Sequence, residues 1–77
     1  MFKQYIRAGD QSQPEANRGV IGIDLMTLVA YVRVPLSGYV TLYVPGSSGY
    51  NVFMTPAEFD EFQTNVKTAN RLKRAYE

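Results

Sequence analysis

The spacing of apolar residues changes near residue 55, and this change separates a predicted sheet from a predicted helix. Residues 19–54 hold short runs rich in Val, Ile, Leu and Tyr, which is typical of β-strands. Residues 55–77 instead repeat apolar positions every three or four residues, which predicts one amphipathic helix. The helical stripe consists of Phe59, Phe62, Val66, Ala69, Leu72 and Tyr76.

The ends of the helix carry their own signals. Thr55-Pro56-Ala57-Glu58 reads as a capping box with proline at the first helical position. Acidic residues follow at the start, and Lys67, Arg71, Lys73 and Arg74 gather at the end, as the helix dipole favours. The four cations are explained more simply by the helix dipole and by solubility than by a binding patch for nucleic acid or for an acidic partner.

Two predicted hairpins set the strand registers. A three-residue loop at 36–38, with Gly38 before a bulge, places Tyr31 opposite Tyr43 and Arg33 opposite Thr41. A five-residue loop at 45–49 places Leu42 opposite Val52. Both registers assign the same side to the core, and a one-residue slip in either would destroy that agreement. The predicted core side carries Ala30, Val32, Val34, Val40, Leu42, Val44, Val52 and Met54.

The opposite side of this predicted sheet is unusually aromatic. Its candidate binding residues are Tyr31, Arg33, Tyr39, Tyr43 and Phe53, accompanied by Thr41 and Asn51. Such a surface is unusual on a monomer, and aromatic and arginine side chains are enriched at binding hot spots.

Three interpretations of this aromatic side remain open. The N-terminal residues can fold back and cover it with Phe2, Tyr5 and Ile6. Two copies of the chain can pack these sides together by two-fold symmetry, which helps a domain too small to build a large core. Single-stranded nucleic acid can stack its bases on the rings, with Arg33 contacting phosphate, although the strands offer little positive charge.

We expect one domain of the α+β class. Residues 1–18 form an N-terminal arm and a polar loop, residues 19–54 an antiparallel sheet, and residues 55–77 the helix. The predicted architecture is a four-stranded β-meander packed against one C-terminal helix, with residues 1–7 as a candidate fifth strand.

Composition narrows the chemistry. The 77 residues include no cysteine and no histidine, which removes disulfides, thiolate ligands and the commonest general base. We therefore expect no enzymatic activity, no metal and no cofactor. The net charge of +1 gives no general attraction to nucleic acid, and no stretch has the apolar length of a membrane span. A cysteine-free chain without a signal-peptide pattern indicates a cytoplasmic protein.

The segment from Tyr39 to Phe59 carries a resemblance in layout. Its hairpin followed by a capped helix resembles the end of the small flagellar FlbD-like proteins and of short phage-borne proteins. Four strands running into one helix is also similar to the single-strand-binding domain of the eukaryotic positive transcriptional coactivator. That second resemblance implies nucleic-acid binding by cationic strands, where this sequence has only Arg33.

These observations predict a non-enzymatic interaction or regulatory protein of the kind that phages, plasmids and small bacterial operons encode. We expect it to bind a protein partner, or itself as a homodimer, through the aromatic side of its sheet. The alternative is a protein that binds single-stranded nucleic acid through the same side.

Overall fold

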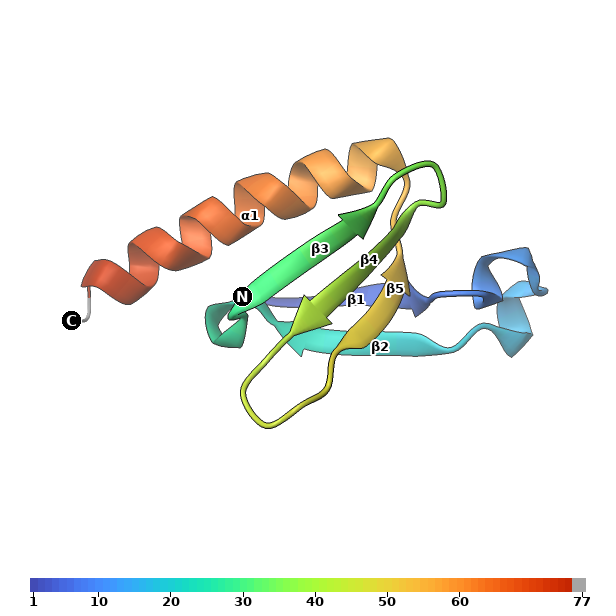
Figure 1. Cartoon of the computed structure of the whole chain (residues 1–77), viewed down its shortest axis with the longest axis horizontal. Helices are drawn as coiled ribbons and strands as arrows, with labels where there is room; N and C mark the ends of the chain where they lie inside the picture. The colour runs from blue at the N-terminus through green and yellow to red at the C-terminus, as the bar shows by residue number, and fades with distance from the viewer. Residues whose placement is uncertain (76–77) are drawn as a thin grey trace.

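The computed structural model describes residues 1–75 and consists of one sheet and one long helix (Figure 1). The elements are β1 (Phe2–Arg7), η1 (Asp10–Ser12), η2 (Glu15–Asn17), β2 (Val20–Asp24), η3 (Leu25–Thr27), β3 (Ala30–Val34), β4 (Tyr39–Tyr43), β5 (Tyr50–Phe53) and α1 (Pro56–Ala75), where η denotes a 3₁₀ helix. The α+β class is confirmed, and the candidate N-terminal strand is present as the fifth strand.

The sheet is antiparallel throughout, in the order β2-β1-β5-β4-β3. Strands β3, β4 and β5 follow one another as a meander, whereas β1 and β2 form a separate hairpin that joins the meander through β1 and β5. The pairing of β1 with β5 is short, at Ile6 with Phe53 and Arg7 with Val52. The two edges of the sheet are therefore β2 and β3.

Helix α1 begins at the predicted capping box. The Glu58 backbone N–H donates to Thr55 Oγ1 at 3.2 Å, and the Thr55 N–H donates to Glu58 Oε1 at 3.2 Å. These two bonds satisfy donors that a helix N-terminus otherwise leaves unpaired. The predicted stripe residue Tyr76 lies outside the described residues.

The core lies between α1 and one side of the sheet. From the helix, Phe59, Phe62 and Ala69 are buried in this cluster, and the Phe62 ring contacts Tyr5 of β1 and Tyr31 of β3. The sheet and the η3 segment supply Tyr5, Ile23, Leu25, Leu28, Val40, Leu42, Val52 and Met54. No helix within residues 1–75 combines the length and apolar character needed to cross a membrane.

The predicted register of the first hairpin is wrong by one residue. The structure pairs Val34 with Tyr39 across a four-residue turn at 35–38, in which Leu36 has φ 70° and Gly38 has φ 76°. A left-handed leucine is rare, so the sequence gives no sign of the extra turn residue. Ser37 stabilises the turn, since its hydroxyl donates to the Val34 carbonyl at 3.1 Å and accepts from the Tyr39 N–H at 3.1 Å.

This slip turns every side chain of β3 to the other side. Ala30, Val32 and Val34, which the sequence assigns to the core, lie on the side away from the helix. The register of the second hairpin is shifted by two residues, because Leu42 pairs with Tyr50 rather than with Val52. A shift of two preserves sidedness, so Val40, Leu42, Val52 and Met54 are buried as predicted.

Candidate functional site

Two of the five predicted binding residues lie beneath the helix. Tyr31 makes edge-to-face contacts with Phe62, at 5.0 Å between ring centroids, and with Phe59, at 6.1 Å. The guanidinium carbon of Arg33 lies 4.6 Å from the centroid of the Phe59 ring, a cation–π arrangement. Tyr31 and Arg33 therefore fasten the edge strand β3 to α1, and their predicted placement beside Tyr43 and Thr41 is wrong.

The other three, Tyr39, Tyr43 and Phe53, do share a surface. Tyr39 pairs directly with Phe53 across β4 and β5, and Tyr43, four residues further along β4, lies on the same side. We call this side of the sheet, opposite α1, the open face (Figure 1). By register it comprises Phe2, Gln4, Ile6, Val20, Gly22, Asp24, Ala30, Val32, Val34, Tyr39, Thr41, Tyr43, Asn51 and Phe53.

Four residues of the open face that the sequence did not assign to it are its most exposed large apolar side chains. Phe2 is 64% exposed, Val20 57%, Val32 53% and Val34 46%. Val32 and Val34 were missed because a valine suits either side of a sheet and the turn fixes the choice. Phe2 and Val20 were missed because β1 and β2 were not expected to widen this surface.

Glycines let the aromatic rings of the open face lie close to the sheet. A Cβ on Gly22 would lie 2.5 Å from Phe2 Cζ, and one on Gly38 would lie 2.8 Å from Phe53 Cε2. At Gly49 a Cβ would lie 3.0 Å from Tyr43 Cε1. Each ring thus lies directly on the backbone of a glycine, and a larger residue there would push the ring away. The rings therefore lie flat against the sheet and form a broad apolar surface.

The N-terminal arm extends the open face and does not cover it. Residues 2–7 run as β1 within the sheet, with Tyr5 buried on the helix side and with Phe2 and Ile6 on the open face. The polar loop contacts the strands of this face where Gln11 Nε2 donates to the Tyr39 hydroxyl at 3.2 Å and the Ala8 N–H donates to the Asn51 carbonyl at 3.0 Å. The interpretation in which the N-terminal residues fold over the rings is therefore wrong.

The open face carries almost no charge. Thr41 and Asn51, its central polar pair, hydrogen-bond to each other at 2.7 Å. Among residues 1–75, no lysine or arginine occupies an open-face position in the strand pairing. Asp24, at the end of β2, accepts a hydrogen bond from the Met26 N–H at 3.0 Å and forms an ion pair with the Met1 ammonium at 3.3 Å. The surface is thus apolar with its main polar groups already satisfied.

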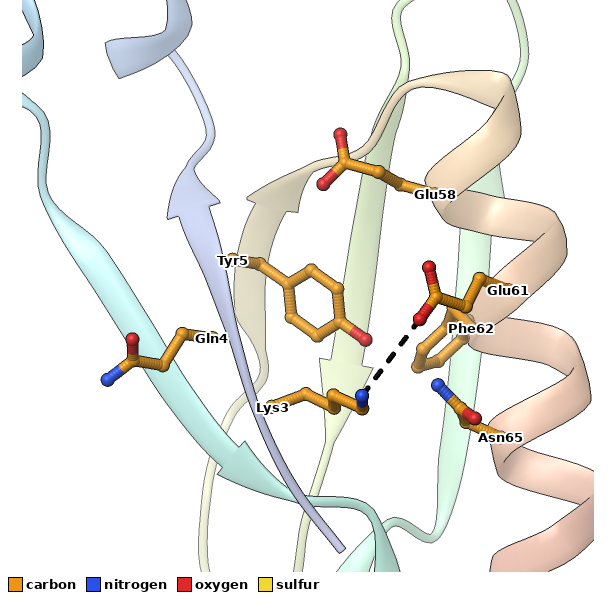
Figure 2. Close-up of a pocket in the computed structure, with 7 residues that line it drawn as sticks. All are labelled: Lys3, Gln4, Tyr5, Glu58, Glu61, Phe62 and Asn65. Atoms are coloured by element: carbon orange, nitrogen blue, oxygen red, sulfur yellow. Dashed lines mark ion pairs between the residues drawn. The ribbon is translucent and has the colours of Figure 1, made fainter.

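A small hollow of about 130 Å³ lies on the other side, between β1 and α1 (Figure 2). Lys3 Nζ and Glu61 Oε1 approach to 3.9 Å beside the Tyr5 ring, and Gln4 points away from them. Burial raises the pKa of the Tyr5 hydroxyl, and the nearby Glu61 and Glu58 carboxylates raise it further. The raised pKa keeps the Tyr5 hydroxyl protonated at neutral pH, so this hydroxyl is not available there as a general base.

Within the described residues, no group of three or more His, Cys, Asp or Glu side chains lies close enough to hold a metal ion. The carboxylates serve local structure instead. Asp10 accepts from the Gly19 N–H at 2.8 Å and pairs with Arg7 at 3.0 Å, and Glu58 belongs to the capping box.

Comparison with protein-family models, with curated proteins and with solved structures found no match to this chain. The class that the fold defines is a small α+β domain with one open apolar sheet face.

Proposed function

We propose that the chain is a non-enzymatic interaction protein that binds a second copy of itself through the open face. The observation that supports this most strongly is the exposure of large apolar side chains on that face, above all Phe2 and Val20 on one flank and Val32 and Val34 on the other. Exposed apolar surface of this extent is a recurring mark of protein contact sites.

The lack of charge suits a self-interaction. In a two-fold dimer each patch meets a copy of itself, so a charged residue near the axis would face its own like charge. The open face has Thr41, Asn51 and Tyr43 where such charges would be costly. Packing two sheets face to face would also give each small domain a second buried layer, as in β-sandwiches.

The small area of the open face argues for a low affinity between two copies of the chain. Five strands at a spacing of about 4.8 Å, each with about five residues rising about 3.3 Å, cover about 24 Å by 16 Å. This is about 380 Å² on each copy, which is below the size of standard stable interfaces and in the range of weak, transient contacts. We therefore expect a dimer that dissociates on dilution rather than an obligate one.

Nucleic acid is the weaker candidate for this face. Stacking of single-stranded bases needs cations to hold the phosphates as well as rings. Arg33, the one strand cation that supported this alternative, instead lies over Phe59 on the helix side. A cytoplasmic location remains part of the proposal and depends on the absence of cysteine, which suits a reducing compartment.

Sedimentation equilibrium over a dilution series tests the self-association. The wild-type chain of 8.7 kDa should approach twice that mass as its concentration rises. The double variant Val32→Ser/Tyr43→Ser removes two open-face side chains and should remain monomeric, because these side chains supply apolar area to the contact.

A control for the tyrosine change is available on the neighbouring strand β5. Tyr50→Ser makes the same tyrosine change at a residue that is 42% exposed but lies on the helix side, because it pairs with the buried Leu42. This control should dimerise like the wild type. A wild-type chain that stays monomeric at every concentration, or a control that loses dimer as fully as the open-face variant, would contradict the proposal.

A further inference from the structure

The outer side of α1 carries a row of cations that the open face does not explain. Lys67, Arg71 and Arg74 follow one another at spacings of four and three residues, so they share one side of the helix. All three are exposed. We call these three residues the basic stripe. The buried side of α1, with Phe62 and Ala69, points elsewhere, toward the sheet.

Within residues 1–75, no acidic helical neighbour neutralises Lys67 or Arg71. The helical neighbours of Lys67 are Gln63, Thr64, Asn70 and Arg71, none of which is acidic. The ion pairs found among residues 1–75 involve Met1, Lys3 and Arg7, and none reaches the stripe. Lys67 beside Arg71, and Arg71 beside Arg74, are like-charge neighbours, which destabilise a helix.

The helix dipole accounts for only part of this arrangement. Its effect falls off within the last turn, whereas Lys67 lies eight residues before the described end at Ala75. Lys73 has a structural role, since its Nζ donates to the Leu28 carbonyl at 3.2 Å and thereby connects the helix to the segment after η3. The predicted group of four cations therefore separates into one structural lysine and three outward ones.

We infer that the basic stripe is a docking site for the phosphate backbone of nucleic acid. Seven residues at about 1.5 Å each place Lys67 and Arg74 about 10 Å apart along the axis, in a straight row that can follow successive phosphates. Two of the three are arginines, whose planar donors match phosphate oxygens in pairs. The contact reads no sequence, because phosphates are common to all sites.

A membrane surface is a poorer match for the same cations. Helices that bind membranes insert a free apolar side between lipids. In α1 that side is already occupied, because Phe59, Phe62 and Ala69 are buried against the sheet. This inference goes beyond the self-association proposed above, and the two surfaces lie on opposite sides of the sheet, so both can be used at once.

Fluorescence anisotropy with a labelled DNA duplex at low and moderate salt provides the test. Three phosphate contacts predict that log K falls with log salt with a slope of about −2.7. The variant Lys67→Gln/Arg71→Gln should lose most of the binding, on the order of tenfold or more. Arg74 is left unchanged because Glu77, three residues later, lies outside the described residues.

The matched control Lys3→Gln/Arg7→Gln removes the same charge from β1 and should bind within about twofold of the wild type. Thermal unfolding should show that the stripe variant is as stable as the wild type, because glutamine is a good helix former and the like-charge contact is gone. Binding that is absent at low salt, lost equally in both variants, or matched by polyglutamate or by anionic vesicles would overturn the inference.

Discussion

Asp24 illustrates how one carboxylate organises a corner of this fold. It ends β2, accepts the Met26 N–H to cap η3, and faces the Met1 ammonium. The hydrogen bond from Met26 is the main cause of the lowered pKa of Asp24, and the ammonium lowers the pKa further. The ionised form is therefore the one that the folded state favours.

This lowered pKa makes a prediction about acid. Because the folded chain favours ionised Asp24, its contribution to stability is present above the ordinary pKa of 3.8 and is lost as the pH falls through the lowered value. Thermal unfolding of wild type and Asp24→Asn should differ near pH 7, with the wild type more stable. The difference should disappear at the most acidic pH, and a difference independent of pH would contradict the role given to the charge.

Leu36 is the residue that made the turn between β3 and β4 unpredictable from the sequence. The capping box at Thr55 and Glu58 was predictable because its signal is local, and the structure confirms it. The left-handed Leu36 has no such signal, since leucine rarely adopts that conformation. One unforeseen turn residue moved Tyr31 and Arg33 from the predicted binding surface to the helix side.

At the scale of elements, β3 depends on the helix more than its edge position suggests. It pairs with β4 on one side only, and Tyr31 and Arg33 reach from it to Phe59 and Phe62. The sequence predicted the strands, the helix and the helix-side residues of β4 and β5, because alternation and helical spacing are strong patterns. It could not fix the sidedness of β3, because valines on one side and Tyr31 with the long Arg33 on the other can each pack against a helix.

The sidedness of β3 is testable with neighbouring substitutions. Tyr31→Ser removes a ring packed against two phenylalanines and should lower the free energy of unfolding by about 2 kcal/mol or more. Val32→Ser, at a side chain that is 53% exposed, should change it by only about 0.5 kcal/mol. Urea unfolding of both variants at a concentration where the chain is monomeric measures the difference, and the reverse order would restore the register predicted from sequence.

At the scale of the whole molecule, the chain places its surfaces on two sides. The helix lies along one side of the sheet (Figure 1). It presents the basic stripe outward, while the other side of the sheet is largely apolar and nearly free of charge. Charge segregation of this kind allows self-association through one side without like charges meeting. It also leaves α1 accessible in a dimer.

The central claim is that the open face, and no other apolar surface, forms the contact between copies. Valine methyl NMR signals followed through a dilution series test this most directly, because the valines report on each surface separately. The signals of Val20, Val32 and Val34 should shift with concentration, while those of Val44, which packs against the core, should not. Open-face signals that stay fixed at every concentration, or Val44 signals that shift as much as they do, would contradict the account.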